Sequence, residues 1–323
     1  MKKSFSVAMR VLISFGLLGL LVWIMKDDLG GIWPALKEIK NYLPVAAFLV
    51  LVNIYLQAYR LKIIFEGEDL DLTLLSSLRL TFIGSFFNNF MPTAVGGDIV
   101  KAHYASRING EKLKSYASVM MDRLIGLYTF VAIAAVSCLV YRGRIDMPAI
   151  KPAVIGITLA GIAGYFVITH KKIAVFLEKA FFGIKMMGLG KKLNDIYEIV
   201  QDYRNRKDVV TKSFVTSVMA QGIYFFTVFF FFRALGGGVS LGDVFLIMPI
   251  VTFLSMVPSL GGLGVREGAI VALFTPIAGK DISFAVSLLV FGGLLFISII
   301  GGIIYFLWNI RGIGAEKKLE GRS

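Results

Sequence analysis

The chain has 323 residues, of which 57% are hydrophobic and only 17% are charged, and its formal net charge is +13. This composition is too apolar for a soluble domain of that length, and basic loops that orient a membrane protein explain the positive charge better than nucleic acid does. One cysteine, Cys138, leaves no disulfide framework, and two histidines, His103 and His170, argue against a zinc site. We therefore expect a polytopic α-helical membrane protein with no cofactor.

The first predicted element is a helix that starts near residue 5. Lys2, Lys3 and Arg10 precede the apolar segment Val11–Met25, as in a signal peptide, but no small-x-small cleavage site follows. We therefore expect an uncleaved first helix and a cytoplasmic N-terminus.

A second helix, roughly Tyr42–Phe65, is predicted to return the chain to the cytoplasm, because basic residues near its end mark the inner side. We interpret Arg60 in its last turns as an anchor whose long side chain reaches the membrane interface. The next apolar stretch, about 72–97, precedes the basic segment 98–116, which is also predicted to be cytoplasmic. A stretch that starts and finishes on one side is explained by a re-entrant or broken hairpin.

A crossing at about 117–141, an outer loop at 142–151 and a returning helix at Pro152–His170 come next. The segment 171–212 carries ten Lys or Arg against five Asp or Glu, and its apolar residues recur at helical spacing. We expect one or two amphipathic helices on the inner leaflet, or a connecting hairpin packed on the bundle.

The second half of the chain repeats this plan. The helix 213–235 crosses outward, and the region 244–279 forms two apolar arms around a break at Pro258–Gly264. A final crossing at 282–310 leaves a basic, cytoplasmic C-terminus. The second hairpin therefore opens from outside, whereas the first opens from inside.

These assignments predict one transmembrane domain, 1–323, in the cytoplasmic (inner) membrane, with inverted repeat halves at 42–141 and 213–310. The amphipathic cytoplasmic segment 171–212 joins them. The predicted fold is all-α, with about six full transmembrane helices and two re-entrant or broken hairpins, or eight or so spans if the hairpins cross.

The two breaks have similar sequences. Asn88–Asp98 and Met256–Glu267 each end an apolar run with Pro, a small hydroxyl residue and paired glycines before a charge. Irregular backbone at membrane depth is tolerated only where protein buries it or where it lines a water-filled cavity, and two such breaks in two halves indicate a transport site. Glycines and helix N-termini suit the approach of a phosphate, and Thr93 and Ser259 are candidate helix caps.

The stretch Gly261–Gly268 superficially resembles a nucleotide-binding glycine loop, but apolar helical runs flank it, so a tight turn between half-helices is favoured. Arg266 and Glu267 could pair with each other, serve as phosphate ligand and counter-ion, or end a helix at the interface. Asp98 could pair with Arg123 or cap a helix.

Two adjacent amides would be costly in lipid unless they are hydrogen-bonded, so Asn88 and Asn89 are expected to face inward or into a cavity. All predicted substrate-binding residues lie at or beside the two breaks. They are Asn88, Asn89, Thr93, Gly96, Gly97, Asp98, Lys101, Asp122, Arg123, Ser259, Gly261, Gly262, Gly264, Arg266 and Glu267.

At these residues the chain resembles the membrane domain of the lysylphosphatidylglycerol synthase/flippase family of integral membrane proteins. The matching pieces are Asn89–Asp98 with Lys101, the pair Asp122 and Arg123, and Pro258–Glu267, and the resemblance covers nearly the whole chain. It implies a phospholipid or polyprenyl-linked lipid moved between leaflets, and re-entrant elements around a headgroup cavity. The full-length synthases also carry a soluble aminoacyl-transfer domain, and we expect that activity to be absent here.

The leading hypothesis is a flippase-like lipid translocase, in which the phosphate-bearing headgroup enters a central polar cavity while the tails stay in the bilayer. Arg123, Arg266 and Lys101 would bind the phosphate, and Asp98 and Glu267 would balance charge or carry protons. The expected partners are membrane lipids with an anionic or phosphate-bearing headgroup. The sequence also leaves open whether the protein forms a homo-oligomer. The alternatives are an integral membrane lipid-modifying transferase, with Glu267 as its base, and a secondary transporter of a small solute.

Overall fold

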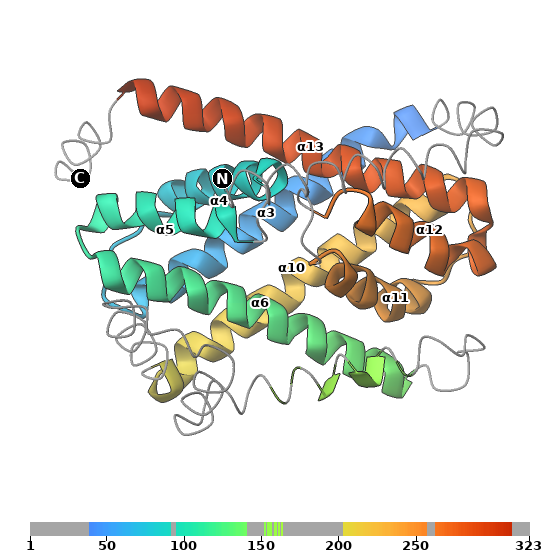
Figure 1. The fold of residues 1–323 in the computed structure, drawn as a ribbon, viewed down its shortest axis with the longest axis horizontal. Coiled ribbons are helices and arrows are strands. Elements are labelled where there is room, and N and C mark those ends of the chain that lie inside the picture. Colours follow the sequence, from blue (N-terminus) through green and yellow to red (C-terminus); the bar gives the residue numbers. More distant parts are fainter. Residues whose placement is uncertain are drawn as a thin grey trace, which may run out of the picture.

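The computed structural model describes residues 39–91, 95–140, 203–256 and 262–311, together with a few positions between 152 and 163. Within these ranges the chain is helical and contains no strand (Figure 1). The main helices are α3 (Leu43–Glu66), α4 (Leu74–Phe90), α5 (Gly96–Asn109), α6 (Lys112–Val140), α10 (Lys207–Ala234), α11 (Leu241–Leu254), α12 (Val265–Ala278) and α13 (Lys280–Arg311). The predicted first helix, most of Pro152–His170 and the bulk of 171–212 lie outside the described residues.

Four helices, α3, α6, α10 and α13, are long and apolar enough to cross a membrane. The all-α polytopic fold predicted from sequence is therefore confirmed for the described part of the chain. Two predicted boundaries were wrong: α6 begins at Lys112 rather than 117, and α10 begins at Lys207 rather than 213. Their polar first turns remain helical because charged residues are tolerated in a helix once it leaves the hydrocarbon layer.

The long helix α10 defines two ends of the molecule. Near its start, the ammonium group of Lys114 donates to the backbone carbonyl of Glu68 at 3.3 Å. The Glu68 carboxylate lies 3.8 Å from the guanidinium of Arg206. Past its other end, Gly237 packs against Ile282. The α4–α5 hairpin therefore has its base at the start of α10, and the α11–α12 hairpin has its base at the far end.

The end of the molecule at which α10 starts is held together by the buried phenol of Tyr203. The short 3-10 helix η2 (Tyr203–Asn205) precedes α10, and its Tyr203 hydroxyl donates to the carbonyl of Ile64 at 2.9 Å and lies 3.1 Å from the Ser118 hydroxyl. Burial raises the pKa of Tyr203, so the phenol stays protonated and remains a donor.

The first hairpin breaks where the sequence requires it. Met91, the C-cap residue of α4, is extended at φ −82° and ψ 138°. This conformation is favoured in the residue before a proline, which here is Pro92. The returning helix packs directly on α4: a Cβ atom at Gly97 would overlap the carbonyl oxygen of Gly84 and stand 2.6 Å from Cγ of Asn88. Only glycine at position 97 permits this backbone contact.

The second hairpin is shaped by its helix caps. Ser240 and Asp243 form a capping box at the start of α11, with 3.2 Å between the Asp243 N–H and the Ser240 hydroxyl. At the start of α12, Gly264 has φ +81°, and its N–H donates to Glu267 at 2.6 Å. The N-cap residues of α5 and α12 are Val95 and Gly264, and the candidate caps Thr93 and Ser259 lie outside the described residues.

The half-helices are too short to cross on their own. The helices α5, α11 and α12 each contain 14 residues, which rise about 21 Å against a hydrocarbon core of about 30 Å. Their lengths favour re-entrant hairpins over full crossings.

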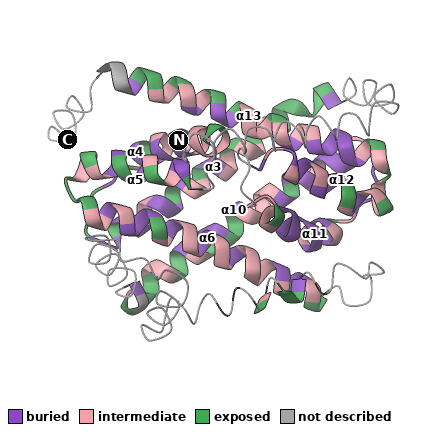
Figure 2. Ribbon diagram, viewed as in Figure 1, coloured by how far each residue is buried: buried purple, intermediate pink, exposed green. Residues whose placement is uncertain are grey.

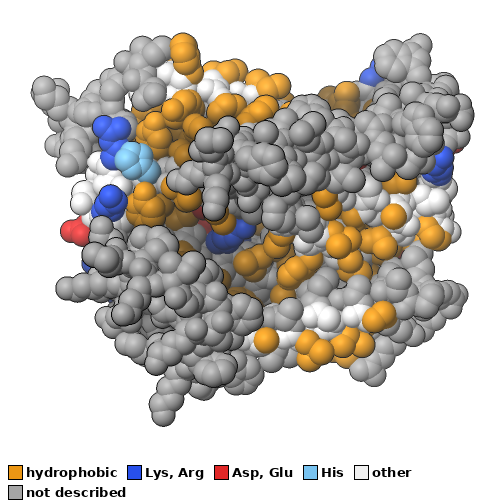
Figure 3. All heavy atoms as spheres, viewed as in Figure 1, with side chains coloured by type: hydrophobic (Ala, Val, Ile, Leu, Met, Phe, Trp, Pro, Cys, Tyr) orange, Lys and Arg blue, Asp and Glu red, His pale blue; other side chains and the backbone are white. Residues whose placement is uncertain are grey.

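Buried residues concentrate where the hairpins meet the long helices (Figure 2). The largest core cluster joins α10 to α11 and α12 through side chains such as Phe225, Phe232 and Phe274. Hydrophobic side chains cover much of the described surface on one face, and a small group of basic and acidic side chains shows in its middle (Figure 3). An apolar exterior with an interior charged group is the arrangement expected of a protein in a bilayer.

Candidate functional site

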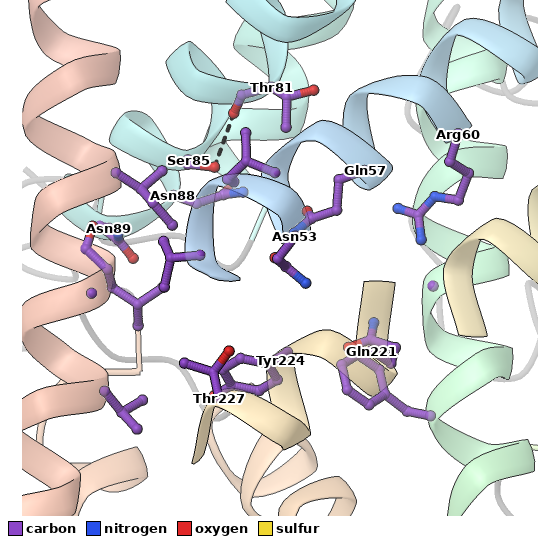
Figure 4. Close-up of a pocket in the computed structure, with 18 of the residues that line it drawn as sticks. Asn53, Gln57, Arg60, Thr81, Ser85, Asn88, Asn89, Gln221, Tyr224 and Thr227 are labelled. Carbon is purple, nitrogen blue, oxygen red and sulfur yellow. Dashed lines mark hydrogen bonds between the residues drawn. The ribbon is translucent and has the colours of Figure 1, made fainter. Parts of the chain in front are cut away.

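A cavity of about 380 Å³ lies between the long helices and the first hairpin. Residues of α3, α4, α5, α6, α10 and α13 line it, and so does Met256, which directly follows α11 (Figure 4). The ends of both hairpins therefore reach the same cavity. Its volume falls in the range of small-molecule sites.

Five charged side chains form a continuous network at one side of the cavity. Arg123 of α6 pairs with Asp98 of α5. The ammonium group of Lys101 lies 3.8 Å from the Asp98 carboxylate and 3.5 Å from that of Asp122. The Asp122 carboxylate also accepts from Nε of Arg60 at 2.7 Å. Each acid is thus shared between two cations, and three cations against two anions leave the network with a net charge of +1.

Arg60 corrects the sequence interpretation. It was expected to extend to the interface, but its side chain is only 8% exposed, and its guanidinium donates to Asp122 and, at 2.7 Å, to Ser217 of α10. A cation at this depth is costly unless it has partners or faces a cavity, and Arg60 has both. The sequence did contain a signal: Gln57, a polar residue three positions earlier, lies on the same helix face as Arg60.

Carboxamide side chains line the neighbouring part of the cavity. Asn53 and Gln57 lie on α3, about two turns and one turn before Arg60 respectively, and Gln221 on α10 faces them with Tyr224 (Figure 4). The Gln57 amide donates to Oδ1 of Asn53 at 2.6 Å, and the Asn53 amide donates to the carbonyl of Ala220 at 2.6 Å. The sequence analysis did not single out these residues, although the 3–4 residue spacing on each helix is visible in the sequence.

The predicted cavity-facing position of the two asparagines is confirmed. The side-chain oxygen Oδ1 of Asn88 accepts a hydrogen bond from the N–H of Gly97 at 2.9 Å, and this bond joins the two arms of the first hairpin. The Asn89 amide donates to the Ser298 hydroxyl at 2.6 Å on α13. Both asparagines also line the cavity, so each combines a structural hydrogen bond with an accessible polar face.

The wall contributed by α13 is apolar. Its lining residues are Leu289, Val290, Gly293, Leu294 and Ile297. Because the polar groups sit on α3, α4, α5, α6 and α10, the cavity has a polar side and a hydrocarbon-like side. This division suits an amphipathic ligand better than a fully hydrated ion.

The charged pair of the second break is arranged differently from the first. Arg266 donates from its guanidinium to Oε1 of Glu267 at 2.6 Å, and Glu267 is fully buried while it caps α12 through the Gly264 N–H. Neither side chain is among those that line the cavity, although Tyr224 is close enough to both to interact with them electrostatically. Of the alternatives left open by the sequence, the structure adopts the mutual pair.

The predicted site residues thus separate into three groups. Asn88, Asn89, Asp98, Lys101, Asp122 and Arg123 line one cavity. Gly96, Gly97, Gly262, Gly264, Arg266 and Glu267 shape or cap the hairpins behind it. Thr93, Ser259 and Gly261 lie outside the described residues.

The fold and cavity define a multi-pass helical membrane protein in which two oppositely based hairpins reach a charged, amphipathic chamber. The chain belongs to the family described as the lysylphosphatidylglycerol synthase transmembrane region, whose model matches residues 7–311. Membership supports a role connected with membrane lipids.

The comparison with curated proteins gives a distant relative of similar length. The chain is 24% identical over 291 residues to the UPF0104 membrane protein PH1989 of Pyrococcus horikoshii, with 82% of this chain and 86% of the relative covered. No solved structure matches the chain.

Proposed function

We propose that the protein is a flippase-like lipid translocase, in which the 380 Å³ cavity holds a phosphate-bearing headgroup while the acyl or prenyl tails stay in the bilayer. The observation that carries this proposal is the network of three cations and two anions, because its net positive charge in a low-dielectric interior attracts one anionic group. A phosphodiester supplies that charge.

Of the five charged residues, Arg123 is the best candidate for first contact with the phosphate. Its side chain is 31% exposed, whereas those of Lys101 and Arg60 are 10% and 8% exposed. A planar guanidinium suits the two free oxygens of a phosphodiester. Lys101 and Arg60 lie deeper and would receive the phosphate as it moves inward.

The opposed hairpins support a mechanism of alternating access. We assign the halves 42–141 and 213–310 to an inverted repeat, since one hairpin has its base at the start of α10 and the other has its base at the far end. Rocking of one half against the other would open the cavity toward each leaflet in turn. By the positive-inside rule, the end that carries Lys114 and Arg206 would be cytoplasmic.

The two alternatives receive less support. A lipid-modifying transferase would need a base at the cavity, yet its candidate, Glu267, is buried in the α12 cap and does not line the cavity. A transporter of a small hydrated solute would not need the apolar wall formed by α13.

The direct test is translocation of a fluorescent or isotope-labelled anionic phospholipid in proteoliposomes that contain the purified protein. The wild-type protein is expected to equilibrate the label between leaflets faster than protein-free liposomes. Arg123→Gln is expected to slow this at least about tenfold, which corresponds to loss of one charge-assisted contact. No acceleration by the wild-type protein would refute the proposal.

The matched control is Arg107→Gln. Arg107 lies near the end of the same hairpin, on α5, but it is exposed and does not line the cavity. Its loss should leave translocation unchanged, so that an equal effect of both substitutions would point to general surface charge rather than to the cavity.

A further inference from the structure

We propose that the headgroup beyond the phosphate is uncharged and rich in hydroxyl groups, of the sugar or polyol type, and that the cavity selects against an ammonium headgroup. This inference rests on the proposed function and deepens it. Two features of the cavity carry it: the carboxylates of the charged network, each already paired with two cations, and the neighbouring polar groups whose hydrogen-bonding capacity is only partly used.

The charge of each carboxylate is already compensated by two cations of the protein. Asp122 already accepts from Arg60 and Lys101, and Asp98 pairs with Arg123 and Lys101. An incoming ammonium would compete with these cations for the two carboxylates and would meet a network that is already net positive. Like charges at close range in a low-dielectric site are strongly disfavoured.

The carboxamides, in contrast, have hydrogen-bonding capacity to spare. In the part of the chain that the structure describes, neither the Gln221 amide nor the Tyr224 hydroxyl has a hydrogen-bond partner, although both line the cavity. Gln57 uses only its N–H group and Asn88 only its carbonyl, so an acceptor and a donor remain. Groups that both donate and accept match hydroxyls, which do the same.

The spacing of these groups fits one headgroup. Gln57 precedes Arg60 by three residues on α3, which is about 4.5 Å along the helix axis, and Asn53 lies about 10 Å from Arg60. A phosphate held at the cationic side would therefore present its substituent to the carboxamides. A site built to hydrogen-bond hydroxyls discriminates strongly against ligands that leave its buried polar groups unpaired.

The test compares two lipids of equal charge. Phosphatidylinositol and phosphatidylserine each carry one net negative charge, but the first adds hydroxyls to the phosphate and the second adds an ammonium and a carboxylate. Binding of each lipid, with identical acyl chains, is measured on the purified full-length protein by native mass spectrometry and by thermal stabilisation. Phosphatidylinositol is expected to bind at least about fivefold more tightly, which corresponds to one or two net hydrogen bonds.

A substitution ties the selectivity to the carboxamides. Gln221→Met keeps the side-chain size but removes the amide, and it should reduce the preference for phosphatidylinositol about two- to tenfold while phosphatidylserine binding stays unchanged. Asn205→Leu is the control, because Asn205 is an exposed carboxamide that does not line the cavity. Gln57→Met provides a second variant if Gln221→Met does not fold.

The outcomes separate this inference from the proposed function. Phosphatidylserine binding as tight as phosphatidylinositol binding, or an equal loss of both in Gln221→Met, would overturn the hydroxyl selectivity even if both lipids are translocated. Selective binding without any translocation would keep the headgroup assignment and overturn the translocase. Competition by soluble glycerophosphoinositol as effective as by the lipid would keep the chemistry and overturn a lipid as its source.

Discussion

The charged network makes a quantitative prediction about the pair Arg60 and Asp122. The pair joins α3 to α6, with a 2.7 Å hydrogen bond between side chains that are 8% and 7% exposed. Removing one partner of such a buried pair leaves the other charge without its counter-ion and costs about 3–5 kcal/mol. We expect Asp122→Asn and Arg60→Gln each to lower the free energy of unfolding by that amount.

The double variant separates a paired network from two independent residues. Independent effects would add to about 6–10 kcal/mol, whereas a shared interaction removes the same contact in both single variants. In the double variant two neutral amides face each other and no buried charge of this pair is stranded. We therefore expect the double variant to recover about 2–3 kcal/mol relative to the sum of the single changes.

The assay is reversible unfolding in mixed micelles with increasing sodium dodecyl sulfate, followed by circular dichroism. Lys62 and Glu66 on the same helix provide the control cycle, because their i,i+4 pair is 29% and 51% exposed and should contribute only about 0.3–0.5 kcal/mol. Additivity of the Arg60 and Asp122 changes to within about 0.5 kcal/mol would refute the network. Recovery of stability without recovery of lipid translocation would assign Arg60 a role in binding as well as in folding.

Three further predictions concern the folding and stability of the hairpins and of the Tyr203 contact. Gly97→Val should prevent the α4–α5 hairpin from packing, because the added atoms would overlap the Gly84 carbonyl, and little folded protein should be recovered by size-exclusion chromatography. Glu267→Gln should cost about 3–5 kcal/mol by leaving the buried Arg266 without its carboxylate, while translocation per folded molecule stays unchanged. Tyr203→Phe should cost about 1–3 kcal/mol because a buried carbonyl loses its donor, and an unchanged unfolding midpoint would contradict that contact.

Much of the fold could be predicted because a bilayer restricts what a sequence can do. Runs of apolar residues predicted the long helices, and prolines followed by glycines predicted the two breaks. A proline lacks a backbone N–H donor and restricts the backbone conformation of the residue before it. The predicted position of Asn88 and Asn89 was also correct, because two amides have no stable place in lipid. These signals are local and need no knowledge of which helices are neighbours.

The cavity itself could be predicted only in part, because its lining depends on which helix faces pack together. Arg60 resembled an anchor when considered on its own helix, and only the packing of α3 against α6 and α10 brings Asp122 and Ser217 to it. Arg266 was considered as a phosphate ligand because a charge near membrane depth faces a cavity or a partner, and the structure shows Glu267 as its partner. A local signal existed for its partner: Glu267 stands at N3, three residues after the N-cap Gly264, which is the position from which a glutamate side chain accepts the N-cap N–H.

The net charge of the cavity bears on how transport would be driven. With all five groups ionised, the empty cavity carries +1, and a bound phosphodiester makes it neutral. Two unit charges about 4 Å apart interact by about 4 kcal/mol at an effective dielectric constant of 20, so the loaded cavity can close away from water at a lower cost than the empty one. If the lower cost makes the loaded protein reorient more readily than the empty one, the proposed translocase should favour exchange of headgroups between leaflets over net pumping. The sharing of each acid between two cations leaves the network with one positive charge, which under the proposed function would be balanced by one phosphate.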